Sequence, residues 1–352
     1  MIILFVGFIT LLVILQGGWS ARMEALRKPA IHSTPSPLPF PNGKGLSPLA
    51  KLKPLSDSQL LSFSKDGHLR IDGLFNKDFL SNQLLPQVIS ALKDRELQAL
   101  RHQIKIVLGR TDVDKMTMDQ CKKVLTSSSV DTNAFPFLQL FQLWRIYEAA
   151  QKVACSMDLA KIACQLLDVP AVRLYQDSLF VKRPGDGATC WHSDLNMAPF
   201  DTNDFLTCWI PLVSVPAVED GGTGLSFASA SHRDFALSYW YDARSAELDG
   251  RYALHDSDAF KVGDATFHHG WCLHSTLPNT SKQTRYAYSV SFVADQTCLL
   301  QKDGHVRRPD DEDTQVHGMK LCSFILTHIM FSFYILFCRA MRSGLRRWDG
   351  AT

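Results

Sequence analysis

A change of hydrophobic period at Pro170 is the feature that most limits how this chain can fold. Before it, apolar residues recur at helical spacing from Gln87 to Leu108 and from Leu159 to Leu167. After it, short apolar segments alternate with turn residues, a pattern typical of strands. The expected strands are Val172 to Val181, Phe205 to Val213, Gly224 to Ala228, Thr266 to Leu273 and Arg285 to Val293. Helices followed by many short strands predict a mainly β, α+β fold, namely a β-sandwich or barrel with N-terminal helices.

The folded domain is expected to occupy residues 57 to 300. The chain has 352 residues, of which 46% are hydrophobic and 20% charged, so it has enough apolar side chain for a large core. Residues 22 to 56 are rich in proline among serine, glycine and lysine, a composition that cannot build a packed core and predicts a linker. Residues 301 to 318 are polar and are expected to leave the domain.

Both ends of the chain are hydrophobic. Residues 1 to 21 hold an apolar run followed by small residues, the pattern of a signal peptide or an N-terminal membrane anchor. Residues 319 to 338 include about 18 consecutive uncharged residues, just enough for a membrane-spanning helix, and residues 339 to 352 form a basic tail. These segments favour a membrane or secretory location. If they are not targeting elements, and the second is an ordinary buried helix, the protein is cytoplasmic.

Charge and cysteine usage exclude some partners. The formal net charge is +2, and no basic run alternates with aromatic residues as a nucleic-acid groove would need. The nine cysteines form no C-x-x-C pair and are odd in number, which argues against a disulfide framework and a thiolate zinc site. We therefore expect no nucleic-acid partner, while the oligomeric state stays open.

Two H-x-D pairs could contribute to a metal site. His192 and Asp194 stand in "TCWHSD", and His232 and Asp234 stand in "SASHRD". A non-haem iron(II) site uses two imidazoles and one carboxylate, and residues two apart on an extended segment point to the same side, so either pair could supply two ligands. The third ligand must come from a distant strand. His274 is a candidate, because it ends the expected strand in "GDATFHHGWCLHSTLPN" with the parity of an inward-facing residue.

Arg285 opens the next expected strand, "RYAYSVSF". It shares one face with Ala287, Ser289 and Ser291. A cation among small residues suggests a buried slot for a carboxylate, because the planar guanidinium makes two charge-assisted hydrogen bonds to such a group.

Taken together, and in their order along the chain, these motifs resemble those of the phytanoyl-CoA dioxygenase family of iron(II)- and 2-oxoglutarate-dependent oxygenases. The resemblance spans Phe63 to Asp295 and rests on "YQDSLFVKRPG", "WHSD", "LTCWIPL", "EDGGTGLSFASASHRD" and "GDATFHHGWCLHSTLPN" followed by Arg285. It implies a double-stranded β-helix, or jelly roll. It also implies that His192, Asp194 and His274 bind iron(II) and that Arg285 binds the distal carboxylate of 2-oxoglutarate.

The resemblance assigns three further positions. Thr276 corresponds to a hydroxyl residue that assists the cosubstrate carboxylate, and Trp209 to a tryptophan near the cosubstrate. His232 falls in a structural turn, where Ala230 replaces the usual glycine.

The resemblance implies an enzyme that hydroxylates a small or lipid-like molecule. Iron(II), 2-oxoglutarate and oxygen would be its cofactor and cosubstrates, and succinate and carbon dioxide its by-products. Asp194 argues against halogenation, because related halogenases carry a small residue at this ligand position. Two alternatives remain: a membrane-tethered binding module with the same fold, and a zinc hydrolase, since two histidines and a carboxylate also suit zinc.

Overall fold

The structure, a computed structural model, describes residues 47–50, 54–108, 110, 112–125, 127, 136–234, 248, 250–300, 306–307, 315–316 and 319–320. All of them belong to one compact unit, Leu38–Thr352. The predicted signal or anchor and the basic tail lie outside the described residues, as do most of the linker, the polar segment and the candidate membrane helix. Met319 and Lys320, at the start of that candidate helix, form a two-residue strand (β14) paired with Gln315–Val316 (β13). Within the described part of the chain, no helix is long and apolar enough to cross a membrane.

Helices fill the N-terminal half of the described chain, as the apolar spacing predicts. The predicted segment from Gln87 to Leu108 is two helices rather than one, α4 (Leu85–Asp94) and α5 (Glu96–Leu108), because Arg95 leaves helical geometry. The second predicted segment is α8, which Ser156 caps at its start and Asp168 ends in a left-handed conformation. Helix α8 spans Met157–Leu167. The other helices before Pro170 include α2 (Asp57–Asp66), α3 (Lys77–Phe79), the π-helical turn η1 (Leu80–Leu84), α6 (Met118–Leu125) and α7 (Glu148–Ala154).

Two antiparallel sheets form the rest of the domain. The larger has the order β1-β8-β5-β10-β3-β2 and the smaller the order β4-β9-β6-β7. The larger sheet contains β1 (His68–Ile71), β8 (Ala265–His269), β5 (Phe205–Pro211), β10 (Arg285–Ala294), β3 (Val172–Lys182) and β2 (Leu138–Phe141). The smaller contains β4 (Thr189–His192), β9 (His274–Thr276), β6 (Ser226–Ala228) and β7 (Leu254–Asp256). The predicted jelly-roll class, mainly β with N-terminal helices, is confirmed.

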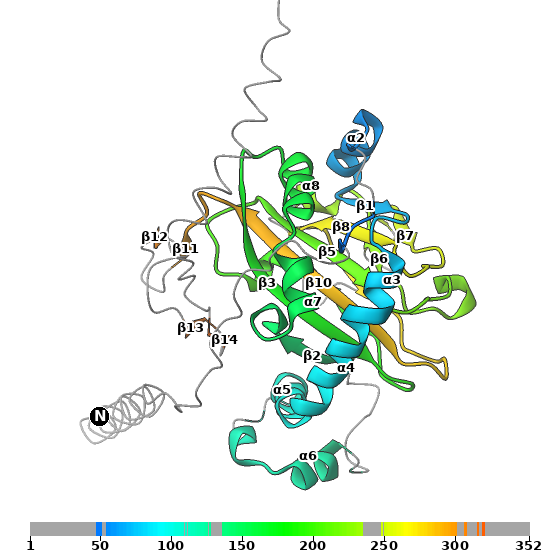
Figure 1. Ribbon diagram of the computed structural model, residues 1–352, viewed down its shortest axis with the longest axis vertical. Coiled ribbons are helices and arrows are strands. Elements are labelled where there is room, and N and C mark those ends of the chain that lie inside the picture. Colours follow the sequence, from blue (N-terminus) through cyan, green and yellow to red (C-terminus); the bar gives the residue numbers. More distant parts are fainter. Residues whose placement is uncertain are drawn as a thin grey trace, which may run out of the picture. The chain divides into compact units, whose positions relative to one another are not determined.

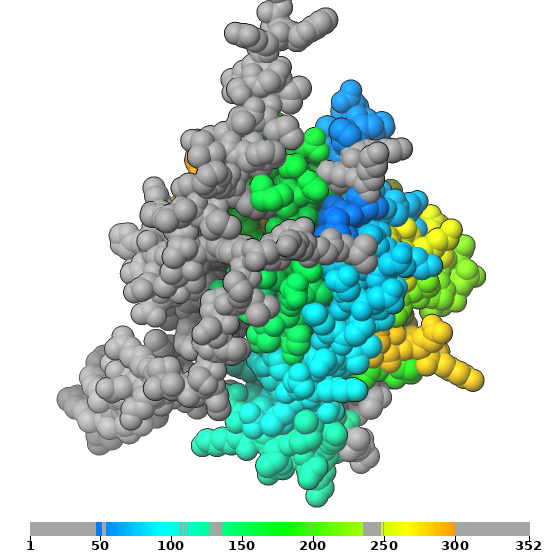
Figure 2. Space-filling model, viewed as in Figure 1, coloured from blue at the N-terminus to red at the C-terminus, as the bar shows by residue number. Residues whose placement is uncertain are grey.

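The larger sheet has two chemically different faces. Leu179 and Val181 of β3, with Tyr288 and Val290 of β10, belong to the main hydrophobic core. Helices α4, α7 and α8 pack on this face, in front of the sheet in Figure 1, and helical residues form much of the surface seen from that side in Figure 2. The opposite face, with its serines and threonines, turns toward the smaller sheet.

The segment Thr266 to Leu273, predicted as one strand, is a strand only as far as His269, and residues 270–273 connect the two sheets. β8 ends at His269, and the chain crosses to the smaller sheet before β9 begins at His274. Gly270 lies in this crossing, where a Cβ atom would come within 2.7 Å of the Cβ of Phe205 and 2.9 Å of that of Leu195. The parity argument that placed His274 on the strand of His268 is therefore wrong, although both side chains still meet between the sheets.

Part of the predicted linker lies on the domain. Leu49 is buried in the main core and forms a β-bridge with Phe75, and the amide of Ala50 donates a 2.9 Å hydrogen bond to the carbonyl of Leu74. The proline-rich composition did not indicate this, because a single apolar residue docked by backbone hydrogen bonds leaves no periodic pattern.

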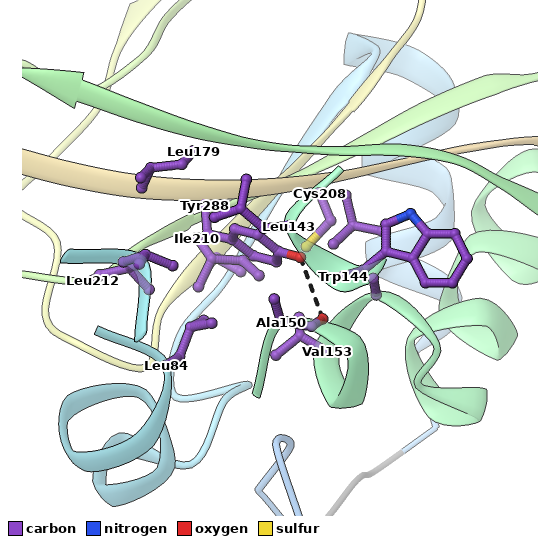
Figure 3. Packing of buried hydrophobic residues seen from close by; sticks show 14 of the residues in the cluster. Leu84, Leu143, Trp144, Ala150, Val153, Leu179, Cys208, Ile210, Leu212 and Tyr288 are labelled. Atoms are coloured by element: carbon purple, nitrogen blue, oxygen red, sulfur yellow. Dashed lines mark hydrogen bonds between the residues drawn. The ribbon is translucent and has the colours of Figure 1, made fainter. Parts of the chain in front are cut away.

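A buried carboxylate ties the helices to the larger sheet. Asp177 accepts hydrogen bonds from the amides of Leu143 and Trp144, at 3.0 and 2.8 Å, and from the Tyr288 hydroxyl at 2.6 Å. Burial raises the pKa of Asp177 to about 6, against the effect of these hydrogen bonds. The Tyr288 hydroxyl also lies 3.2 Å from the carbonyl of Ala150 in α7 (Figure 3).

We expect the substitution Tyr288→Phe to lower the free energy of unfolding by about 1–3 kcal/mol, because it leaves buried acceptors without their donor. Chemical denaturation at neutral pH measures the change. Tyr286→Phe is the matched control, since Tyr286 is partly exposed and its hydroxyl makes no hydrogen bond with described residues. Equal stability of the two variants would contradict the assignment.

Candidate functional site

Three predicted ligands meet between the two sheets. His192 ends β4, Asp194 follows two residues later, and His274 begins β9, directly opposite His192 in the ladder. Asp194 Oδ1 lies 3.9 Å from His192 Nε2 and 3.7 Å from His274 Nε2. One ligand atom from each of the three residues falls within 4.8 Å of the others, so the set can hold a metal ion.

Hydrogen bonds set the tautomer of both imidazoles. His192 Nδ1 lies 2.8 Å from the carbonyl of Cys190, and His274 Nδ1 lies 3.0 Å from the carbonyl of Cys272. A carbonyl only accepts, so each Nδ1 carries the proton and each Nε2 keeps its lone pair for a metal. Burial, with the neighbouring His192 and His268, holds the pKa of His274 well below its ordinary value and keeps this imidazole neutral.

The larger sheet orients the carboxylate ligand. Asp194 Oδ2 accepts hydrogen bonds from Thr207 Oγ1 in β5, at 2.7 Å, and from His268 Nε2 in β8, at 3.2 Å. Thr207 and His268 are themselves partners in the ladder. Burial opposes ionisation of Asp194, but the imidazole of His274 and the hydrogen bond from His268 outweigh it and lower the pKa of the carboxyl. The other oxygen, Oδ1, faces the two histidines, as a monodentate metal ligand requires.

Arg285 is buried in the same cavity with most of its donors unused. It is 5% exposed, and its Nη1 donates a 2.7 Å hydrogen bond to the carbonyl of Thr223. Its Nε has no hydrogen-bond partner. Its guanidinium carbon lies 5.5 Å from the centre of the Trp209 ring. Burial lowers the pKa of Arg285 to about 10, partly offset by Asp186, so the side chain is a cation at neutral pH with room for a carboxylate.

A second buried cation, Lys182, was not predicted. It ends β3 opposite Arg285 in the ladder and is 0% exposed. Its Nζ donates hydrogen bonds to Thr276 Oγ1, at 3.0 Å, and to the carbonyl of Gly187. Thr276 Oγ1 in turn donates to Thr189 Oγ1 at 2.9 Å. Burial and the nearby Arg285 lower the pKa of Lys182 to about 7, against the effect of Asp186. Strand parity could have found it, because Lys182 shares the site-facing positions of β3 with Ser178 and Phe180.

One cavity of about 290 Å³ is lined by all six predicted residues. They are His192, Asp194, His274, Arg285, Thr276 and Trp209. The predicted face of β10 is also there, with Ser289 and Ser291 in the wall. The sequence did not indicate that β2 and α5 close the far end of the cavity.

The second H-x-D pair lies elsewhere. His232 sits in the turn η7 (Ser231–Asp234), with its Nε2 3.3 Å from the carbonyl of Ser64. Asp234 accepts hydrogen bonds from Arg251 Nε, at 3.0 Å, and from the hydroxyl of Tyr252, at 2.8 Å. Ala230, which precedes this turn, has φ of +68°, a left-handed conformation that explains why glycine suits the position. The interpretation of "SASHRD" as a turn agrees with this geometry.

Two imidazoles and a carboxylate on one side of a cavity, with a buried arginine beside them, are the arrangement of a non-haem iron(II)- and 2-oxoglutarate-dependent oxygenase on a jelly roll. The sequence model "Phytanoyl-CoA dioxygenase (PhyH)" matches residues 63–287. The chain belongs to the phytanoyl-CoA dioxygenase family.

Several solved structures are similar in fold. The non-haem, α-ketoglutarate-dependent carbocyclase SnoK from nogalamycin biosynthesis is 19% identical, with a TM-score of 0.48 over 70% of this chain and 86% of that chain. The epimerase SnoN, crystallised with Fe³⁺, α-ketoglutarate and nogalamycin RO, is 17% identical, with a TM-score of 0.48 over 75% and 93%. EctD from S. alaskensis, crystallised with 2-oxoglutarate and 5-hydroxyectoine, is 17% identical, with a TM-score of 0.49 over 78% and 87%. The comparison with curated proteins found no match.

Proposed function

We propose that this protein is an iron(II)- and 2-oxoglutarate-dependent dioxygenase that hydroxylates a small or lipid-like molecule. In this proposal His192, Asp194 and His274 bind the iron, and Arg285, Thr276 and Trp209 bind the cosubstrate. One observation carries the proposal: two Nε2 lone pairs and Asp194 Oδ1 converge in the cavity that also holds the buried, largely unpaired Arg285.

The chain's own residues would divide the work between holding the metal and placing the cosubstrate. With iron(II), 2-oxoglutarate and oxygen bound, such a centre supplies oxidation of a C–H bond coupled to formation of succinate and carbon dioxide. Arg285 offers its remaining N–H groups to the distal carboxylate of 2-oxoglutarate. The Trp209 ring lies beside that arginine, in the wall of the same cavity. Thr207 and His268 hold Asp194 in the orientation that metal binding needs.

Purified protein loaded with iron(II) tests the proposal. We expect succinate to form from 2-oxoglutarate with consumption of oxygen, and no succinate without iron. A zinc hydrolase would instead retain zinc, consume no oxygen and leave Arg285 without a role. A binding module with no catalysis would fail to bind iron(II) or 2-oxoglutarate in a titration and would form no succinate above the iron-free background. Either result would overturn the proposal.

Lys182 is proposed to support cosubstrate binding through Thr276. Two buried basic side chains, Lys182 and Arg285, stand opposite each other in the ladder of β3 and β10, and Lys182 forms no ion pair with a carboxylate of the described residues. A bound carboxylate would supply the missing negative charge. Because one hydrogen bond contributes about 0.5–1.5 kcal/mol, we expect Lys182→Met to raise the dissociation constant of 2-oxoglutarate by roughly 10-fold.

Affinity measured well below the melting temperature separates this role from a structural one. Lys182→Met leaves the carbonyl of Gly187 and Thr276 Oγ1 without their donor, so we expect a folded variant that melts somewhat lower than the wild type and binds 2-oxoglutarate more weakly. Lys161→Met, on the surface of α8, is the matched control. Unchanged affinity in Lys182→Met, measured by titration calorimetry, would contradict the assignment.

A further inference from the structure

The cavity extends well beyond the metal ligands and the cosubstrate residues. Helix α5 and strands β2 and β3 contribute to its far end. The lining residues there are His102 and Gln103 from α5, Phe137 just before β2, Gln139 and Phe141 in β2, and Phe180 in β3. We call this end the distal arm. Asp194 is held by β5 and β8, whereas the distal arm lies at β2, three strands from β5 in the sheet order. With strands about 4.8 Å apart, β2 lies roughly 14 Å from β5, the strand whose Thr207 holds Asp194.

Aromatic rings form much of the distal arm. Phe137 packs edge-to-face on Phe180, with ring centres 5.1 Å apart, and Phe141 packs edge-to-face on His102, with ring centres 5.6 Å apart. Rings in this arrangement give the arm a largely apolar wall. The part of a substrate that passes through it must be largely hydrocarbon.

The polar groups of the distal arm are neutral. Among the described residues that line the cavity, Asp194 is the one carboxylate and Arg285 the one guanidinium. Asp194 is assigned to iron and Arg285 to the cosubstrate. The arm itself offers amides and one imidazole. Burial lowers the pKa of His102, and the positive charge of the nearby Lys105 lowers it further. This imidazole is therefore uncharged at neutral pH. An ionic group in the arm would find no opposite charge among the described residues that line it, and its desolvation would disfavour binding.

Gln103 and His102 each carry a buried atom without a partner. Gln103 is 4% exposed, and its Nε2 donates a 3.2 Å hydrogen bond to the carbonyl of Phe137. That bond sets the orientation of the amide and leaves Oε1 as an unpaired acceptor. His102 Nε2, on the preceding residue, is also buried and unpaired. Buried polar groups are nearly always satisfied in folded proteins, so an unpaired acceptor in a cavity wall is a group that a ligand would pair.

We infer that the substrate is an uncharged, largely apolar molecule with a hydroxyl or amide N–H at the end remote from the oxidised carbon. Gln103 Oε1 can only accept, so the ligand group must donate. A hydroxyl also has lone pairs and can therefore pair with His102 Nε2 in either tautomer. Gln103 and the aromatic walls are then specificity-determining residues. This inference rests on the proposed function, since it places the reacting carbon at the metal ligands.

Four probes with one ten-carbon skeleton test the inference: decan-1-ol, decane, decanoate and decylamine. Their binding is measured by saturation-transfer NMR on the whole protein, with and without manganese(II) and 2-oxoglutarate. We expect decan-1-ol to bind at least 10-fold more tightly than the other three. Gln103→Leu should remove the preference for the alcohol over decane, and Gln103→Glu should shift it to decylamine. Gln98→Leu, an exposed glutamine on the same helix, should change neither.

The inference is overturned if decanoate or decylamine binds the wild type best, if none of the four probes binds, or if Gln103→Leu keeps the alcohol preference. Thermal unfolding of each variant confirms folding, and Gln103→Glu, which is nearly isosteric, keeps the test valid if Gln103→Leu does not fold. Probe binding is also read without metal and cosubstrate. The two proposals can therefore fail separately. If the inference about the distal arm is wrong, the alcohol preference is absent; if the proposed oxygenase activity is wrong, no succinate forms.

Discussion

Replacing Asp194 with alanine is expected to remove iron(II) binding and to reduce succinate formation by more than roughly 100-fold. Loss of a residue that merely orients a ligand already costs about 10- to 100-fold in such sites, and Asp194 is proposed as a ligand itself. The substitution also leaves Thr207 and His268 without their shared acceptor. Metal analysis after desalting and the yield of succinate per protein measure the two effects.

The second H-x-D pair provides the matched control. Asp234→Ala makes the same chemical change at the same spacing from a histidine, but Asp234 bonds to Arg251 and Tyr252 outside the cavity. We expect this variant to keep its iron and its turnover. Iron retained by Asp194→Ala, or lost by Asp234→Ala, would show that the wrong pair has been assigned.

Arg285→Met is expected to raise the dissociation constant of 2-oxoglutarate by roughly 10²- to 10⁴-fold. Two charge-assisted hydrogen bonds to a carboxylate contribute about 1.5–3 kcal/mol each, and methionine supplies neither while keeping a similar length. Iron binding should persist, because the ligands His192, Asp194 and His274 make no hydrogen bond to Arg285 among the described contacts. Calorimetric titration with 2-oxoglutarate, with manganese(II) in place of iron, measures the change without turnover.

Arg183→Met controls for the loss of a cation near this end of the sheet. Arg183 follows Lys182 directly, but its side chain is 39% exposed and forms an ion pair with Asp186. Its substitution should change 2-oxoglutarate affinity little. Arg285→Lys should recover part of the lost affinity, because it restores the charge without the planar fork. An Arg285→Met protein that binds 2-oxoglutarate like the wild type would exclude the proposed cosubstrate site.

Local pattern was enough to predict several parts of the site. Strand alternation placed Arg285, Ser289 and Ser291 on one face of β10, and the structure has all three in the cavity wall. The order of the motifs along the chain indicated which H-x-D pair belongs with His274 and Arg285. Long-range arrangement was harder: the sequence suggested one strand through His268 and His274, but β8 and β9 lie in different sheets.

The sequence by itself determined the helices before Pro170, the approximate positions of β3, β5, β6, β8 and β10 beyond it, and the chemical identity of the candidate ligands, because hydrophobic period and side-chain chemistry are local properties. Only the tertiary structure decided that β4 pairs with β9, that Thr207 and His268 hold Asp194 from the other sheet, and that Lys182 lies beside Thr276. It also brought α5 and β2 to the far end of the cavity. These contacts join residues far apart in the chain, and they form only when the two sheets and the helices bury their apolar faces together.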